Sequence, residues 1–334
     1  MRYLSLFSGI EAATQAWQPL GWECVAVSEI EPFPCAVLEH HYPHVPNLGD
    51  VTKITEQQIK DLGQIDLIVF GSPCQNLSVA GNRKGFEGEQ SSLFYAAMEI
   101  IKHAKRHCKT RFALWENVPG AFSSNKGADF TEVVKHMAGL DELDTPTNGW
   151  GKEGAAVGSN GLLEWSVLDA QWFGLAQRRK RVFAIVDFGD WTSRPPILLE
   201  RESCRGEVAP SRGEGKGYAA DVKASPAYGV NLKPFEIGES FELVGTLTAC
   251  CYKDPKGVVK NKKVRRLTPI EYERLQGFST NFTKIPYRNK SADDCPNGPR
   301  YKALGNSMAV NVMAWIGQKI QQTQGVKVYG AKTL

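Results

Sequence analysis

Two strand ends in this sequence carry side chains that could take part in catalysis. Cys74 lies in "GSPCQNLSVAG", directly after the apolar run 65–70, "IDLIVF", which is typical of a buried strand. Glu116 and Asn117 follow a second apolar run, "FALW". Because ligands bind at the carboxyl ends of strands in open α/β sheets, we expect the thiol and the carboxyl group to share one sheet edge. A thiolate is a nucleophile, and a nearby carboxyl group can hold a proton for a substrate.

Each of these residues also has a simpler interpretation. A free cysteine is commonly a small buried hydrophobic residue, and Glu116 alone is consistent with a loop carboxylate that faces solvent. The eight cysteines form neither a CxxC pair nor a Cys/His pattern, so we expect reduced thiols in a cytoplasmic protein and no metal site. Other motifs must therefore distinguish the catalytic interpretation from the structural one.

A glycine turn, "LFSGIEAA" at residues 6–13, connects the first expected strand to the first expected helix. Backbone amides at such a turn can bind a ligand, but the turn lacks the GxGxxG pattern, which argues against a nicotinamide dehydrogenase. Glu29 ends the second expected strand, where an acidic side chain can accept hydrogen bonds from both ribose hydroxyls. A surface carboxylate is the alternative interpretation of Glu29.

Strands and helices alternate through the first half of the chain. This alternation predicts βαβ units and a doubly wound, mostly parallel sheet, and therefore an α/β fold. Segments 163–173 and 181–188 look like a hairpin that adds an antiparallel pair to the sheet. The other strands are expected at 3–7, 23–29, 65–70 and 112–118, and the helices at 11–21, 34–42 and 91–107.

From about Trp191 the sequence becomes rich in Pro, Gly and Ser, which predicts a linker followed by short strands and turns. A helix is expected to begin after Thr268 and to end at Gly277. A last amphipathic helix is expected to begin at or near Asn306. Residues 147–161 are expected to form a glycine-rich surface loop.

The chain of 334 residues carries a net charge of +4, a mild excess that permits a polyanionic partner. Its basic residues cluster in "RHCKTR", "QRRKRVF" and "KNKKVRR", although a solvated surface is the simpler interpretation of any single cluster. The sequence has neither a signal peptide nor an apolar run of about 18 residues. We therefore expect a cytoplasmic protein that does not enter a membrane.

Six motifs, in their order along the chain, resemble those of the bacterial and phage DNA (cytosine-5) methyltransferases. They are "LFSGIEAA", "GSPCQNLSVAGNRKGF", "ENVPG", "QRRKRVF", "RRLTPIEYERLQGF" and "ALGNSMAVNV", and only about residues 190–260 lie outside the resemblance. The resemblance implies S-adenosylmethionine as the cofactor and double-stranded DNA as the substrate. It also implies a Rossmann-like catalytic domain and a smaller, irregular, β-rich target-recognition domain.

The resemblance assigns catalytic roles to four residues. Cys74 would be the nucleophile, and Glu116 would hold the cytosine, while Arg179 and Arg181 would lie by the cytosine carbonyl or its phosphate. The thiolate would add to carbon 6 so that carbon 5 can attack the methyl group. A base inside a duplex cannot reach such a site, so the cytosine would be flipped out of the helix.

The same resemblance implies a set of cofactor-binding residues. Two departures from the family pattern concern cofactor affinity: Ile10-Glu11-Ala12 replaces the more usual second glycine of the loop, and Ile30 stands where a larger side chain is common. The implied residues are Phe7, Ser8 and Gly9 along the cofactor, Glu29 on the ribose, Ile30 against the adenine, Asp50 near the adenine amino group, and Asn306 and Ser307 at the methionine end.

The resemblance also implies how the chain is divided. Residues 1–188 and 303–334 would form the catalytic domain, and 189–302 the target-recognition domain, in which Thr246 and Thr248 are candidates for base contacts or for an edge strand. A cognate restriction endonuclease and a monomeric state are further expectations. A tRNA cytosine-5 methyltransferase of the same fold and a catalytically silent DNA-binding regulator are the alternatives.

Overall fold

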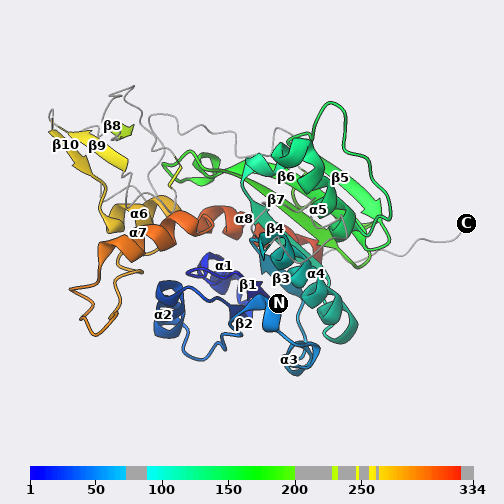
Figure 1. The fold of residues 1–334 in the computed structure, drawn as a ribbon, viewed down its shortest axis with the longest axis horizontal. Helices are drawn as coiled ribbons and strands as arrows, with labels where there is room; N and C mark the ends of the chain where they lie inside the picture. Colours follow the sequence, from blue (N-terminus) through cyan, green and yellow to red (C-terminus); the bar gives the residue numbers. More distant parts are fainter. Residues whose placement is uncertain (73–88, 200–227, 232–245, 248–255, 261–262, 325–334) are drawn as a thin grey trace, which may run out of the picture.

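Figure 1 presents the computed structural model, which describes residues 1–72, 89–199, 228–231, 246–247, 256–260 and 263–324. A seven-stranded sheet has the strand order β2-β1-β3-β4-β7-β6-β5. The first four strands in this order are parallel, and β7, β6 and β5 continue the sheet in antiparallel pairs. The strands are β1 (Arg2–Leu6), β2 (Glu23–Ser28), β3 (Leu67–Phe70), β4 (Phe112–Asn117), β5 (Glu153–Gly158), β6 (Gly161–Asp169) and β7 (Lys180–Asp187).

Helices cover both faces of this sheet (Figure 1). The α-helices are α1 (Ala12–Trp17), α2 (Pro32–His41), α3 (Glu56–Asp61), α4 (Glu89–His107), α5 (Ala128–Ala138), α6 (Pro269–Gln276), α7 (Asn297–Asn306) and α8 (Val310–Gln324). The 3-10 helices are η1 (Gln18–Leu20), η2 (Val51–Lys53), η4 (Pro119–Phe122), η5 (Ser124–Gly127) and η6 (Ala170–Phe173).

Side chains alternate between two hydrophobic cores because successive residues of a strand point to opposite faces. Leu67 and Val69 of β3 pack in the core that contains α1, α2 and α8, and Ile68 and Phe70 pack in the core that contains α4 and α5. All four side chains are buried, which explains the unbroken apolar run of this strand. The predicted doubly wound α/β fold is therefore confirmed, including the antiparallel pair β6–β7.

A second, three-stranded antiparallel sheet stands apart from the large one (Figure 1). It consists of β8 (Tyr228–Asn231), β9 (Lys256–Lys260) and β10 (Lys263–Arg266). Helix α6 follows with the predicted boundaries, because Thr268 and Glu271 form a reciprocal capping box and Gly277 ends the helix in the left-handed conformation. Buried side chains of α6 and α7, such as Tyr272 and Ala303, belong to the core of α1, α2 and α8.

Two local predictions are wrong. Residues 147–161 do not form only a loop, because β5 lies within them and pairs with β6. An added Cβ at Gly154 would lie 2.2 Å from the Trp165 ring, so the glycine that suggests a loop in fact makes room for an aromatic ring. The last helix does not begin near Asn306, which is the final residue of α7. Within the described ranges, no helix has both the length and the apolar character needed to cross a membrane.

Candidate active site

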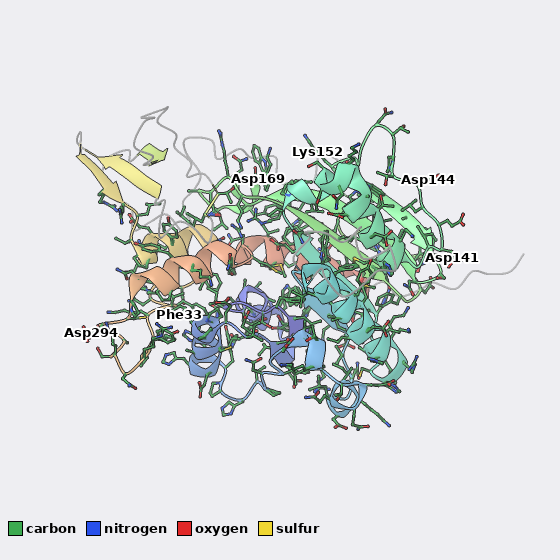
Figure 2. All side chains as sticks on the ribbon, in the orientation of Figure 1. Phe33, Asp141, Asp144, Lys152, Asp169 and Asp294 are labelled. Atoms are coloured by element: carbon green, nitrogen blue, oxygen red, sulfur yellow. The ribbon has the colours of Figure 1, made fainter. Side chains whose placement is uncertain are left out.

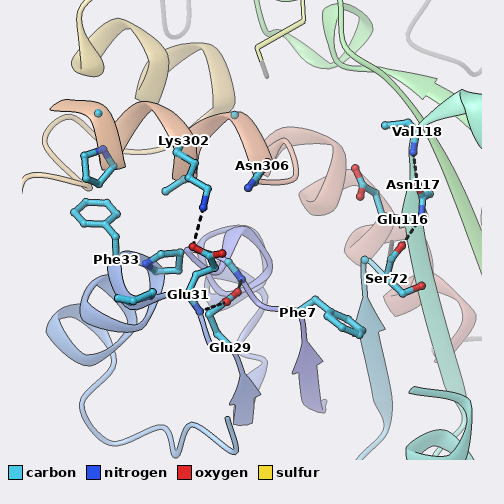
Figure 3. Close-up of a pocket in the computed structure, with 18 of the residues that line it drawn as sticks. Phe7, Glu29, Glu31, Phe33, Ser72, Glu116, Asn117, Val118, Lys302 and Asn306 are labelled. Carbon is cyan, nitrogen blue, oxygen red and sulfur yellow. Dashed lines mark hydrogen bonds and ion pairs between the residues drawn. The ribbon is translucent and has the colours of Figure 1, made fainter. Parts of the chain in front are cut away.

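A cavity of about 730 Å³ lies at the carboxyl ends of β1 to β4, facing α7. Figure 3 shows Glu116 and Ser72 on one side of it and Glu29 and Lys302 on the other. The predicted site residues that line it are Phe7, Gly9, Glu29, Glu116, Arg179, Arg181 and Asn306. One sheet edge therefore brings together residues that are far apart in the sequence, as the strand-end argument predicts.

Other predicted site residues lie elsewhere. Ser8 and Ser307 line a smaller cavity of about 60 Å³, which shares several lining residues with the large one. Ile30 lines neither cavity, and its side chain is 68% exposed. Asp50 also lines neither, because its carboxylate caps η2 and accepts hydrogen bonds from Thr52. Cys74 lies outside the described residues, two positions beyond Ser72.

The glycine turn after β1 is held by hydrogen bonds to β2. Phe7 and Gly9 both have positive φ angles, of 54° and 56°. The Ser8 hydroxyl donates to the Ser5 and Ser28 carbonyls, and the Ser8 amide also donates to Ser28. These hydrogen bonds fix the conformation of the turn, and residues of the turn line both cavities.

Glu29 is oriented by three backbone amides. One carboxylate oxygen accepts from Gly9 N at 2.8 Å, and the other accepts from Ile30 N and Glu31 N, each at 2.8 Å. A carboxylate offers about four acceptor positions, so this arrangement leaves capacity for a further donor in the cavity. Glu29 therefore lies at the cavity with its carboxylate fixed in orientation and with room for one further hydrogen-bond donor.

Glu116 forms a salt bridge with Arg181 at the opposite side of the cavity. Arg181 Nε lies 3.1 Å from Glu116 Oε1, and both side chains are largely buried. Antiparallel pairing of β4 with β7 places Glu116 opposite Phe183 and brings Arg181 next to it. Burial raises the pKa of Glu116, although the charges of Arg181 and Arg179 oppose this shift. A raised pKa favours the protonated carboxyl, which can donate to a ring nitrogen.

Arg179 is committed to backbone carbonyls. Its side chain is buried, and it donates to Leu247 O at 2.8 Å, Ser307 O at 2.6 Å and Gly305 O at 3.3 Å. Nearby, the Thr246 hydroxyl donates to Arg178 O at 2.7 Å, while Thr248 lies outside the described residues. Arg179 therefore joins the turn before β7 to residue 247 and to the α7–α8 connection.

The chain that leads toward Cys74 is fastened to the end of β4. Asn117 Nδ2 donates to Ser72 O at 2.6 Å, and Trp115 Nε1 donates to Ser72 Oγ at 3.1 Å. An added Cβ at Gly71 would lie 3.5 Å from Glu116 Oε2, so the glycine lets this segment pass close to the carboxyl group. The sequence indicated that Asn117 lies at this edge, but not that its side chain donates to the Ser72 carbonyl.

Two contacts across the cavity were not predicted. Lys302 Nζ of α7 lies 2.8 Å from Glu31 Oε2, at the start of α2 (Figure 3). Phe33 of α2 stands against the loop between α6 and α7 (Figure 2), where its ring meets Tyr287 edge-on at 5.0 Å. These contacts join segments more than 250 residues apart, and no local pattern in the sequence indicates such pairs.

Comparison with known proteins places these features in context. Residues 1–188 and 207–322 match the family model described as C-5 cytosine-specific DNA methylase. The chain is 30% identical to the "DNA N-6-adenine-methyltransferase" of Escherichia phage P1, a match that covers 99% of this chain and 62% of that protein. It is 25% identical to "Type II methyltransferase M.HhaI" of Haemophilus parahaemolyticus, over 98% of this chain and 97% of that one.

A solved structure has a similar fold. The S. pombe Dnmt2 methyltransferase superposes with a TM-score of 0.67 and 18% sequence identity, over 96% of this chain and 98% of that one. At this identity the similarity establishes the fold.

Proposed function

This chain belongs to the C-5 cytosine-specific DNA methylase family, and from that premise we propose that Cys74, Glu116 and Arg181 form its catalytic centre. The protein is an S-adenosylmethionine-dependent DNA cytosine-5 methyltransferase. The observation that supports the site best is the buried pair of Glu116 and Arg181 in one cavity with Glu29. The end of the cavity at Glu116 and Arg181 would bind the cytosine, and the end at Glu29 would bind the nucleoside portion of the cofactor.

S-adenosylmethionine supplies an electrophilic methyl group on a sulfonium. The residues around the large cavity fit this cofactor. Glu29 can accept a further hydrogen bond from the ribose, and the Phe7–Gly9 turn lines the cavity beside Glu29. Asn306 and Ser307 would hold the methionine end. The exposed Ile30 side chain is available to cover the adenine, with Asp50 near its amino group.

Glu116 would hold a proton at ring nitrogen 3 of the cytosine. Its raised pKa supports this role, because a neutral carboxyl can donate a hydrogen bond that an ionised one cannot. Arg181 would orient Glu116 through their salt bridge and stand by the cytosine carbonyl. The two side chains together would stabilise charge that develops on the ring.

Cys74 would add to carbon 6 of the cytosine as a thiolate, which makes carbon 5 electron-rich. Once carbon 5 carries the methyl group, loss of its proton to solvent would restore the double bond between carbons 5 and 6 and release the sulfur as a thiolate. The short path from Ser72, fastened by Asn117 beside Glu116, supports the placement of this thiol near the cavity.

Arg179 has a supporting role in this proposal. Its guanidinium donates to three backbone carbonyls, so it would position the α7–α8 connection that carries Asn306 and Ser307. It would act on the substrate through these segments and through its charge near Glu116.

Duplex DNA would bind across the opening of the cavity, with the target base flipped out. We assign residues 1–188 and 303–334 to catalysis and 189–302 to target recognition. The separate β8–β10 sheet supports this division for the residues before α6, whereas α6 and α7 pack in the core of α1, α2 and α8. A cytoplasmic location, a monomeric state and a cognate restriction endonuclease are part of the same proposal.

A methylation assay tests the proposal. Purified protein is incubated with radiolabelled S-adenosylmethionine and either duplex oligonucleotides or tRNA, and the modified bases are identified after digestion to nucleosides. We expect label in 5-methylcytosine of duplex DNA. Label in N6-methyladenine, as the name of the phage P1 relative would suggest, or in tRNA alone would contradict the proposal.

A further inference from the structure

Glu11 occupies an unusual place in the glycine turn. Its backbone is left-handed, with φ 63° and ψ 61°, a conformation that glycine adopts readily and side chains disfavour. Its amide donates to Ser8 O at 3.0 Å, which closes the turn. A charged residue at such a position has a cost in stability, so its carboxyl group invites a functional explanation.

The Glu11 carboxyl group is buried, with a relative exposure of 1%, and only one of its oxygens is used. Oε1 accepts from the Thr14 amide and the Thr14 hydroxyl, each at 3.2 Å. Oε2 makes no hydrogen bond of ordinary geometry among the described residues, although the Ser5 hydroxyl lies close enough to the carboxyl group to oppose the rise in its pKa. A buried carboxylate oxygen without a donor is costly, and a bound ligand group would remove that cost.

The 60 Å³ cavity lies beside this carboxyl group and adjoins the proposed cofactor site. Glu11 lines it together with Ser5, Ser8, Asn306 and Ser307. The residues that line both this cavity and the large one are Phe7, Gly9, Gly71, Glu116 and Asn306. The small cavity therefore adjoins the large one, at the end that we assign to the methionine portion.

The described groups that face Glu11 supply no positive charge to its carboxylate. The groups that face it are the Tyr3 hydroxyl of β1, the Cys24 thiol of β2 and the Tyr42 hydroxyl after α2, and the Glu116 carboxyl borders the same cavity. No lysine or arginine in the described part of the chain forms an ion pair with Glu11. Burial raises the pKa of Glu11 to about 7, although the hydroxyls of Ser5 and Thr14 oppose this shift.

We propose that Glu11 Oε2 receives the α-ammonium group of the methionine portion of the cofactor. This inference rests on the proposed cofactor site. An ammonium group supplies both the missing donor and the missing positive charge, whereas a water molecule would supply only a donor. Because an ammonium ion favours ionised Glu11, cofactor binding near neutral pH releases part of a proton.

Calorimetry on the full-length protein tests this inference with two ligands. S-adenosylhomocysteine carries the amino-acid portion, and 5′-methylthioadenosine lacks it. Glu11→Gln keeps an acceptor for Thr14 but places an amide donor toward the ammonium, so we expect about 10- to 100-fold weaker binding of S-adenosylhomocysteine. Binding of 5′-methylthioadenosine should stay unchanged.

The matched control is Thr14→Val, which disturbs the same buried cluster without touching Oε2. Thr14→Val should not change the ratio of the affinities for S-adenosylhomocysteine and 5′-methylthioadenosine. Between pH 6 and 7.5 the affinity of the unmodified protein for S-adenosylhomocysteine should rise several-fold, and that of Glu11→Gln should not. If Glu11→Gln fails to fold, Glu11→Gly suits the left-handed backbone and should show the same selective loss.

The possible failures are distinguishable. Unchanged binding of S-adenosylhomocysteine by the variant overturns the role of Glu11 and leaves the cofactor site intact. An equal loss for both ligands also overturns it, because Glu11 would then only support the turn. If the unmodified protein binds neither ligand, the proposed cofactor site is wrong and the inference falls with it.

Discussion

Arg181 Nε lies 3.1 Å from Glu116 Oε1 in a pair whose side chains are only 14% and 12% exposed. The two residues come from adjacent antiparallel strands, 65 positions apart in the sequence. Desolvation outweighs the opposing positive charges, so the pKa of Glu116 is raised although an arginine is next to it. The carboxyl group of this pair therefore holds its proton to a higher pH than an ordinary salt-bridged glutamate does.

Glu116→Gln should slow methylation by roughly 10- to 10⁴-fold, the range expected for a positioned acid and its electrostatic support. Because the pKa of Glu116 is raised, its protonated form persists to higher pH, and the rate should fall as pH increases through that pKa. The variant should lose this decrease. Single-turnover rates measured from pH 5 to pH 9 check both points, and an unchanged rate would show that the carboxyl group is misassigned.

Cys74→Ser should abolish methyl transfer, because a hydroxyl group is a far weaker nucleophile than a thiolate. Binding of duplex DNA should be largely retained, since the side chains are similar in size. Electrophoretic mobility shifts and methylation assays on the same preparation separate the two effects. Ordinary turnover by the serine variant would rule out the covalent mechanism.

Arg179→Met should lower the free energy of unfolding by about 2–4 kcal/mol, because the Leu247, Gly305 and Ser307 carbonyls lose a buried donor. Urea unfolding measures the change. Lys180→Met, at the adjacent exposed position that begins β7, is the control and should have little effect. Loss of methylation with unchanged stability would instead indicate direct contact with the substrate.

Thr246→Ala should weaken binding to the target site or relax its sequence preference, by roughly 1–3 kcal/mol for a lost specific contact. In the structure its hydroxyl donates to Arg178 O, so the effect would arise through the loop that it fastens as well as through any base contact. Methylation of a library of sites measures the preference. Loss of S-adenosylmethionine binding without DNA, with the preference unchanged, would mean that this segment supports the catalytic domain.

The sequence allowed the strand-end residues and the α6 boundaries to be predicted because both depend on local rules. The unbroken apolar run locates β3, and Thr268 with Gly277 marks the two ends of α6. Placement of Glu29 and Glu116 at one edge then follows from the parallel topology.

Other features of the site depend on packing between distant segments. The carbonyl groups to which Arg179 donates lie 68 to 128 positions away in the sequence, and the Lys302–Glu31 pair spans 271 positions. β5 was missed because Gly154 reads as a loop residue until Trp165 is placed against it. The sequence marked Glu11 as a departure from a glycine, but only the fold reveals its unpartnered oxygen.

Glu11→Gln should change how the stability of the cofactor-free protein depends on pH. Burial raises the pKa of Glu11 from 4.5 to about 7, so the folded state holds a proton that the unfolded state has already lost. The stability from this group is complete below pH 4.5 and is lost as pH rises through about 7, by up to about 3 kcal/mol.

Glutamine does not titrate, so the variant should gain stability relative to the unmodified protein between pH 5 and pH 8. Urea unfolding at both pH values measures the difference. Glu39→Gln, at an exposed position of α2, is the control and should leave the difference between the two pH values almost unchanged. A Glu11→Gln protein that follows the same pH dependence as the unmodified one would mean that Glu11 is ionised throughout, and that its free oxygen already has a donor in solution.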